Sequence, residues 1–218
     1  MKKRTVIALI LFLLFTTITT EQRIVISKFN LKKIVIENNF LIKEEEIKKL
    51  LASIYGKNLL SLENNEIEKL LKQNSFIGSF NVKKKYPNTL KIKIFEKEPI
   101  AVLQIKKEKY YLSEKIELIK FKPLNNSKEL PYVIGNKNNF KEFYSDLKKI
   151  NFPFSLVKKY TFYESNRWDI ETINKKVIKL PNDNYIKSLE NFLGLRNQDN
   201  FKDYKVFDYR INNQLILK

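Results

Sequence analysis

The most constraining feature of this chain is a run in which apolar residues alternate with lysines, "VKKKYPNTLKIKIFEKEP", at residues 82–99. Alternation with a period of two is typical of a β-strand that has one buried and one solvated face. It places Leu90, Ile92 and Ile94 on one face, with lysines opposite. A Pro-Asn corner in the middle suits a tight turn, because proline presets φ and asparagine tolerates left-handed geometry. The run therefore predicts a hairpin with one wet face.

This run ends with two acidic residues, Glu96 and Glu98, followed by Pro99. Pro99 cannot donate a hydrogen bond to a strand ladder, so the pairing is expected to change near Glu98. Glu96 and Glu98 lie two residues apart and therefore share one face of a strand. Two carboxylates on one face are a candidate acid/base pair. We interpret them instead as a solvated strand edge.

The composition restricts the classes of function. The 218 residues, of which 43% are hydrophobic, are enough for one or two compact domains, and the net charge is +18. The chain has no Cys and no His, which excludes thiol nucleophiles, histidine bases and the usual zinc ligand sets. A strong positive charge is typical of nucleic-acid or anionic-membrane binding. Because the lysines are spread along the whole sequence without an aromatic and arginine platform, we favour a solvated basic surface over a nucleic-acid groove.

The amino-terminal segment is directed to a membrane. Three basic residues at 2–4 precede the uncharged stretch "TVIALILFLLFTTITT" at 5–20. As a helix this stretch is about 24 Å long, slightly short of a hydrocarbon core of about 30 Å. The basic residues predict a cytoplasmic amino terminus, residues 1–4, and an extracytoplasmic chain after Glu21. A cleaved signal peptide is the alternative, but an Ala-x-Ala exit is missing, so we favour an uncleaved anchor.

A small domain is predicted next. A β-rich run at 31–39 ends in Asn-Asn, which suits a positive φ. Two amphipathic helices follow, the first opening with three glutamates and closing at Gly56, the second starting near Asn64. Their inward positions are Ile47, Leu50, Leu51 and Ile54, then Ile67, Leu70 and Leu71. With the hairpin, the order is strand, helix, helix, strand, strand.

The residues of this region resemble the POTRA domain of the FtsQ/DivIB family of bacterial cell-division proteins. The matching motifs are GKNLL at 56–60 and YPNTL at 86–90, followed in order and spacing by Ile92, Glu96, Pro99 and Ala101. Two positions depart from the family pattern. Asn38 replaces a usual glycine, and Lys43 replaces the usual Ser or Thr helix cap, which should weaken the helix start without changing the fold.

The second half is rich in short strand-like runs, interrupted by two helices predicted near residues 140–150 and 184–195. Trp168 is interpreted as a packing anchor rather than a ligand-stacking residue. This half resembles the β domain of the same family at Trp168 and Ile170, at IKLP (178–181) and at Asp208-Tyr209-Arg210. The predicted fold class is therefore α+β: a single transmembrane helix, a POTRA domain and a mixed or antiparallel β domain with two helices.

The resemblance implies an organisation and a function. The expected regions are a cytoplasmic tail (1–4), a signal anchor (5–20), a linker (21–28), a POTRA domain (29–97) and a β domain (98–218). The expected protein is a non-catalytic inner-membrane scaffold of the division machinery at the septum, which binds FtsB and FtsL and helps control septal peptidoglycan synthesis. No cofactor, nucleic acid or small-molecule substrate is expected.

The partner site is expected in the terminal segment, where a strand at a sheet edge accepts a partner strand by β-augmentation. The residues placed there by position in the family are Arg210, Ile211, Asn213, Gln214 and Ile216. Leu215 and Leu217 alternate with Ile216, and an ordinary core role stays open for them. The alternative function is a POTRA module of outer-membrane assembly or transport, which needs a long transmembrane β-barrel.

Overall fold

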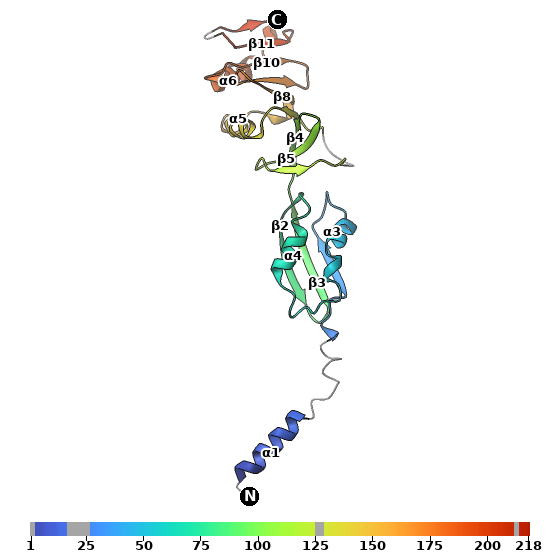
Figure 1. Ribbon diagram of the computed structural model, residues 1–218. Coiled ribbons are helices and arrows are strands. Elements are labelled where there is room, and N and C mark those ends of the chain that lie inside the picture. The colour runs from blue at the N-terminus through green and yellow to red at the C-terminus, as the bar shows by residue number, and fades with distance from the viewer. Residues whose placement is uncertain (1–2, 17–26, 125–128, 212–213) are drawn as a thin grey trace. The chain divides into compact units, whose positions relative to one another are not determined.

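The protein was analysed as a computed structural model, which describes residues 3–16, 27–124, 129–211 and 214–218. Two compact units make up the chain, Met1–Glu96 and Lys97–Lys218 (Figure 1). Each unit has its own sheet, three-stranded in the first and nine-stranded in the second. The α+β class predicted from the sequence is confirmed.

Helix α1 (Lys3–Thr16) is the first described element. Its large apolar side chains are exposed, from 41% for Val6 to 67% for Phe12. Across the described parts of the chain, no helix has both the length and the apolar character needed to cross a membrane. The predicted span at 5–20 continues past Thr16 into residues that lie outside the described part.

The first unit contains the predicted strand, helix, helix, strand, strand order. Its elements are β1 (Lys33–Glu37), α3 (Glu44–Leu50), a 3-10 turn (Ala52–Ile54), α4 (Asn64–Leu71), β2 (Ile77–Lys85) and β3 (Thr89–Glu96). Strand β3 lies in the middle, parallel to β1 and antiparallel to β2. Leu90, Ile92 and Ile94 of β3 are fully buried, as the alternation predicted.

The two helices of this unit supply its core, with small differences from the sequence pattern. Ile47, Leu51, Ile54, Ile67 and Leu71 are fully buried. Leu50 and Leu70 are only half-buried. At Leu50 helix α3 ends and a tighter 3-10 turn follows, which shifts the apolar stripe of this helix. Lys43 gives α3 no side-chain cap, as expected.

One prediction about this unit is wrong. Glu96 was expected at a solvated strand edge, but its carboxylate accepts hydrogen bonds from the backbone N–H groups of Phe40 (3.1 Å), Leu41 (2.7 Å) and Ile42 (2.8 Å). Nearby, Asn38 has the expected positive φ of 65°, and its side chain donates to the Ile94 carbonyl at 2.9 Å. Glu96 therefore fastens the loop after β1 to the end of β3.

The second unit is built on the nine-stranded sheet, in the order β12-β11-β10-β9-β8-β7-β4-β5-β6. The strands are β4 (Pro99–Ile105), β5 (Glu108–Ser113), β6 (Leu118–Lys120), β7 (Tyr132–Ile134), β8 (Val157–Tyr163), β9 (Arg167–Thr172), β10 (Val177–Lys179), β11 (Val206–Asp208) and β12 (Ile216–Leu217). The β4–β7, β7–β8 and β10–β11 pairs are parallel, and the other pairs are antiparallel. The sheet is therefore mixed.

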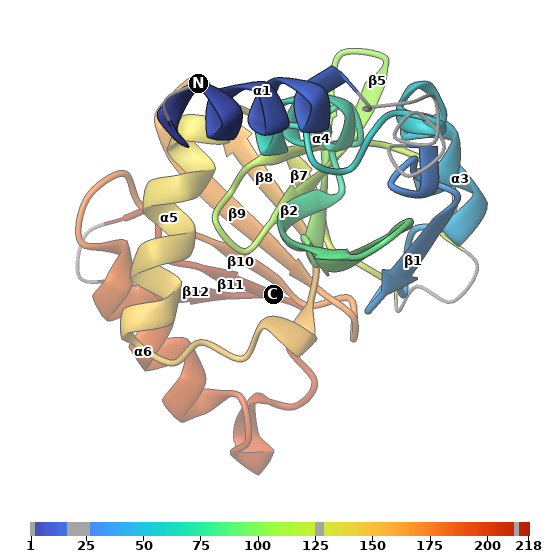
Figure 2. The ribbon, with the colours of Figure 1, turned by 90° about the horizontal axis from the view of Figure 1, so that it is seen from below.

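Helices α5 (Lys137–Lys149) and α6 (Tyr185–Leu195) lie along one side of this sheet (Figure 2). Trp168 is 5% exposed and stacks on Phe143 of α5, with ring centroids 4.7 Å apart. It is a packing anchor, as predicted. Tyr160 lies in the same core, where its hydroxyl has no hydrogen-bond partner among the described residues and burial raises its pKa.

Candidate partner-docking site

The terminal strand β12 is the outermost strand of the nine-stranded sheet. It pairs with β11 on one side, and no described strand lies on its other side. Val206 and Lys218 exchange two backbone hydrogen bonds, of 2.8 and 3.1 Å. In an antiparallel ladder the next residue then turns its backbone groups away from the partner strand. The N–H and C=O of Leu217 consequently face the open side of the sheet.

The side chains of β12 divide between the two faces. Leu215 and Leu217 are half-buried and pack against the hydrophobic core. Ile216 alternates with them and is 36% exposed. The core reading left open for the two leucines is therefore confirmed, and Ile216 is the apolar side chain that this strand presents to solvent.

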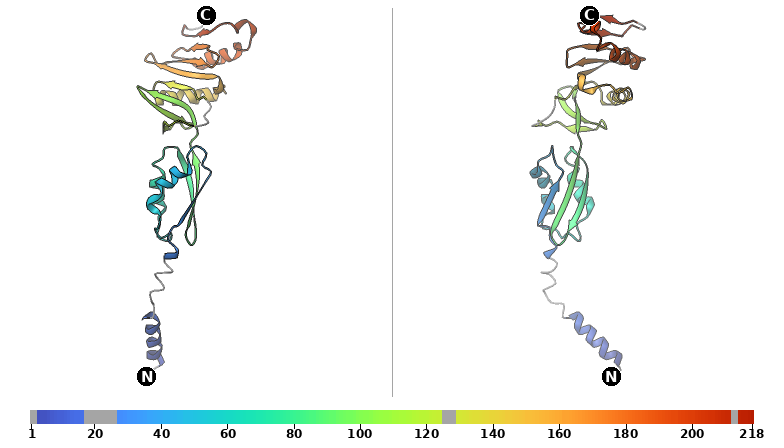
Figure 3. Two further views of the ribbon diagram at one scale, coloured as in Figure 1. Left: turned by 90° about the vertical axis from the view of Figure 1, so that its right-hand side faces the viewer. Right: turned by 180° about the vertical axis from the view of Figure 1, so that it is seen from behind.

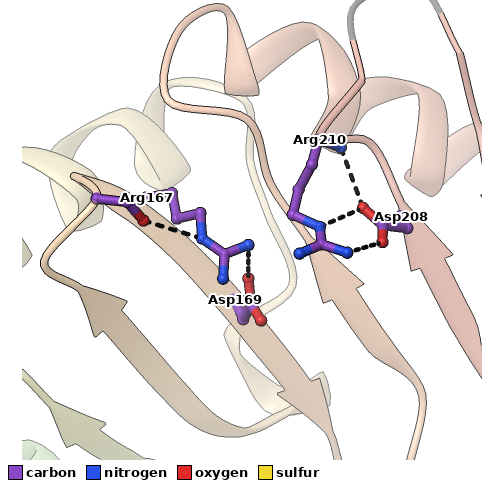
Figure 4. Close-up of polar contacts among 5 residues, drawn as sticks. Arg167, Asp169, Asp208 and Arg210 are labelled. Carbon is purple, nitrogen blue, oxygen red and sulfur yellow. Dashed lines mark hydrogen bonds and ion pairs between the residues drawn. The ribbon is translucent and has the colours of Figure 1, made fainter.

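Arg210 is held in place by Asp208 at the end of β11 (Figure 4). Its backbone N–H donates to Oδ1 of Asp208 at 3.1 Å, its Nε donates to the same oxygen at 2.8 Å, and its Nη2 donates to Oδ2 at 2.6 Å. The hydrogen bond from Arg210 lowers the pKa of Asp208, whose side chain is only 8% exposed. The Arg210 side chain is 43% exposed, so the pair presents a fixed cation to solvent.

A second arginine and aspartate pair lies on β9 (Figure 4). Arg167 Nη1 is 3.9 Å from Oδ1 of Asp169, and Arg167 Nε donates to the Ser165 hydroxyl at 3.1 Å. Burial raises the pKa of Asp169, while the charge of Arg167 opposes that shift. Neither Arg167 Nη1 nor Asp169 Oδ1 has a hydrogen-bond partner within the described residues. This pair is looser than the Asp208 and Arg210 pair.

The strand register aligns these charges across the sheet. Asp169 of β9 is opposite Lys179 of β10, and Lys179 is opposite Asp208 of β11. Asp208 is in turn opposite Ile216 of β12. Residues that are partners in register lie on the same face of the sheet. Asp169, Lys179 and Asp208 therefore form a row of alternating charge on three neighbouring strands, and Ile216 lies next to this row on the edge strand.

An open hollow of about 1160 Å³ lies at this end of the second unit. Its lining includes Arg167, Lys187, Tyr209, Arg210, Ile211 and Gln214. The Tyr209 hydroxyl donates to the Asn191 side chain at 2.9 Å, and burial raises the pKa of Tyr209 to about 12. Within the described ranges no group of three or more acidic residues is placed to hold a metal ion. The lining combines cationic, amide, hydroxyl and apolar side chains with the carboxylate of Asp183.

The structure brings together some of the residues expected from the sequence. Arg210, Ile211 and Gln214 line the hollow, and Ile211 is 50% exposed. Ile216 lies in β12 outside that lining, and Asn213 lies outside the described residues. We refer to Arg210, Ile211, Gln214 and Ile216 as the rim. Sequence reasoning missed Arg167, Asp169 and Lys179. The signal for them was alternation, because they flank the buried residues Trp168 and Ile178 and therefore lie on the face opposite the core.

Comparison with protein families covers almost all of the folded chain. The family model described as POTRA domain, FtsQ-type, matches residues 29–97. The model described as Cell division protein FtsQ/DivIB, C-terminal, matches residues 101–210, half of the 218 residues. The chain belongs to the FtsQ/DivIB family. The family match ends at Arg210, the first residue of the rim.

Individual relatives of the chain are consistent with its membership of the FtsQ/DivIB family. It is 29% identical over 194 residues to Cell division protein FtsQ of Rickettsia conorii (strain ATCC VR-613 / Malish 7), covering 87% of this chain and 72% of the relative. The FtsQ protein of Agrobacterium fabrum (strain C58 / ATCC 33970) is 23% identical over 179 residues, covering 80% and 56%. The solved extracytoplasmic domain of DivIB from Geobacillus stearothermophilus aligns at a TM-score of 0.36 and 12% identity, over 47% of this chain and 92% of that domain.

Proposed function

We propose that this chain is a non-catalytic scaffold of the cell-division machinery that captures FtsB and FtsL through its rim. Membership of the FtsQ/DivIB family supports the division role. The absence of Cys and His from the sequence, and the engagement of Glu96 by three backbone N–H groups, support a non-catalytic role. In this role the protein gathers at the septum and helps control septal peptidoglycan synthesis through its partners.

The observation that carries the proposal is the edge position of β12. A partner strand adds to such an edge through main-chain hydrogen bonds, here with the outward N–H and C=O of Leu217. Ile216 supplies an exposed apolar contact, and Arg210 supplies a cation that is already fixed by Asp208. Fixing the cation beforehand lowers the entropy cost of binding an acidic partner group.

Ile216→Lys is expected to weaken FtsB capture about tenfold, because an edge lysine opposes strand pairing and the apolar contact is lost. The side chain is 36% exposed, so folding should be retained. Ile173→Lys is the matched control, since Ile173 is 56% exposed and lies in a turn away from the rim. Titration of purified FtsB by calorimetry measures both affinities, and equal affinities would refute the rim as the docking site.

Removing the whole terminal segment is a weaker test of the same site. Leu215 and Leu217 pack against the core, and the Lys218 carbonyl accepts hydrogen bonds from the backbone N–H groups of Lys205 and Val206. Deletion therefore uncovers apolar surface and leaves the backbone N–H groups of Lys205 and Val206 without their acceptor. A loss of capture after deletion would not separate misfolding from a lost contact.

We also propose that residues 5–20 anchor the chain in the inner membrane, with the amino terminus in the cytoplasm and the folded units in the periplasm. The exposed apolar side chains of α1 and the basic residues before them support this. An alkaline-phosphatase fusion after Lys218 is then expected to be active in cells, and a β-galactosidase fusion at the same position is expected to be inactive. The reverse pattern would contradict the topology.

A further inference from the structure

The three-stranded sheet of the first unit has two unlike faces. Helices α3 and α4 cover one face, as Figure 3 shows, and the buried side chains of β3 point toward them. No described element of this unit covers the other face. Strand alternation and register place five lysines there, which we call the lysine face: Lys33, Lys83, Lys85, Lys91 and Lys93.

Lysines outnumber acidic residues on this face, and two of the lysines are directly opposite each other. Lys83 of β2 is directly opposite Lys91 of β3. One carboxylate shares the face: Glu37 lies 2.6 Å from the Lys91 ammonium, and the hydrogen bond from Lys91 lowers the pKa of Glu37. The acidic residues of this unit gather instead on the helices, at Glu44, Glu45 and Glu46 of α3 and at Glu66 of α4.

Such an arrangement is costly for folding alone. Like charges directly opposite each other on adjacent strands are destabilising. The repulsion is relieved when an anionic surface lies against the sheet. The separation of lysines from acidic residues cannot be seen in the sequence, where lysines are spread uniformly. It arises because alternate residues of paired strands lie on one face of the sheet.

Two exposed phenylalanines distinguish between kinds of anionic partner. Phe40 is 82% exposed in the loop after β1, and Phe95 is 39% exposed near the end of β3. Because β1 and β3 are parallel, both rings lie at the same end of the sheet. The Lys93 ammonium is 5.5 Å from the centroid of the Phe95 ring. Segments that lie at a bilayer surface combine basic residues with phenylalanine side chains that enter the headgroup boundary.

We propose that the lysine face docks the first unit onto a membrane surface rich in anionic lipid headgroups, with Phe40 and Phe95 entering the headgroup boundary. This surface takes no part in the partner capture assigned to the rim, so the two proposals fail independently. Near an anionic bilayer each lysine is expected to favour the docked state roughly fivefold at low salt. Salt weakens the interaction by screening.

The test uses the full-length chain in bilayer discs. The chain has no Cys, so Asn81→Cys places one fluorophore on the lysine face, opposite Lys93. Asn65→Cys places the same fluorophore on exposed α4 as a reference. Quenching by spin-labelled lipid is expected for the Asn81→Cys label in phosphatidylglycerol discs. Little quenching is expected in phosphatidylcholine discs, at high salt, or for the Asn65→Cys label.

Charge variants complete the test. Lys83→Gln with Lys93→Gln is expected to lower the ratio of docked to undocked protein roughly 30-fold. Lys49→Gln with Lys69→Gln removes the same charge from exposed helix positions and is expected to change the ratio by less than about twofold. Equal quenching of the two labels, or equal effects of the two charge pairs, would overturn the proposal. Binding of soluble polyglutamate to the lysine face without lipid quenching would also overturn it and would assign an acidic protein partner.

Discussion

Glu96→Ala is expected to destabilise the loop after β1 by about 3 kcal/mol, because three charge-assisted hydrogen bonds lose their acceptor at once. Two of them, from the N–H groups of Leu41 and Ile42, are partly buried. Ile42 is 1% exposed, so its amide cannot readily turn to solvent. Hydrogen exchange at residues 40–42 measures the effect directly, and exchange there should accelerate on the order of 100-fold.

Glu98→Ala is the matched control for this substitution. Glu98 has the same side chain, lies two residues further on and is exposed. Substitution of an exposed side chain away from such contacts usually changes stability by less than about 0.5 kcal/mol. If the two variants exchange at the same rate at residues 40–42, Glu96 does not fasten the loop.

Features set by neighbouring residues could be predicted from the sequence. Alternation identified Leu90, Ile92 and Ile94 as buried, because the side-chain period of a strand is fixed by its geometry. The positive φ of Asn38 followed from the tolerance of asparagine for the left-handed region. The role of Glu96 did not follow, since its hydrogen-bond donors lie 54 to 56 residues earlier in the chain.

The strand order of the second unit also depends partly on neighbouring residues and partly on residues far apart in the chain. The antiparallel neighbours β8, β9 and β10 follow one another in sequence, as the short strand-like runs of this half allow. Strand β7 lies between β4 and β8 through parallel pairing on both sides, which no local pattern encodes. Parallel neighbours are joined by a crossover connection, and the place that the second strand takes in the sheet depends on tertiary packing.

The candidate site was predictable in part for the same reason. The Asp-x-Arg spacing at the end of β11 brings Asp208 and Arg210 together within three residues, so local geometry suffices. The alignment of Asp169 with Lys179 depends on the register between β9 and β10. Register is set by the whole hydrophobic pattern and not by the residues that it aligns.

Gly135→Ala is expected to destabilise the second unit by about 4 kcal/mol, the sum of backbone strain and overpacking. Gly135 follows β7 with a φ of +145°, a region that side chains rarely adopt. An added Cβ would lie 2.7 Å from Cβ of Phe162 on β8, closer than real contacts allow. Phe162 cannot move away cheaply, because its ring packs on Trp168 at 4.9 Å.

Urea unfolding followed by the fluorescence of Trp168, the one tryptophan of the chain, measures this change in the unit that contains it. Gly194→Ala is the matched control. Gly194 lies within α6, and an added Cβ there meets no atom within 4 Å. That substitution is expected to stabilise the unit by about 0.5 kcal/mol, because alanine favours the helix. Similar shifts for the two variants would show that the β7–β8 junction relaxes around a new side chain and that Gly135 is not required there.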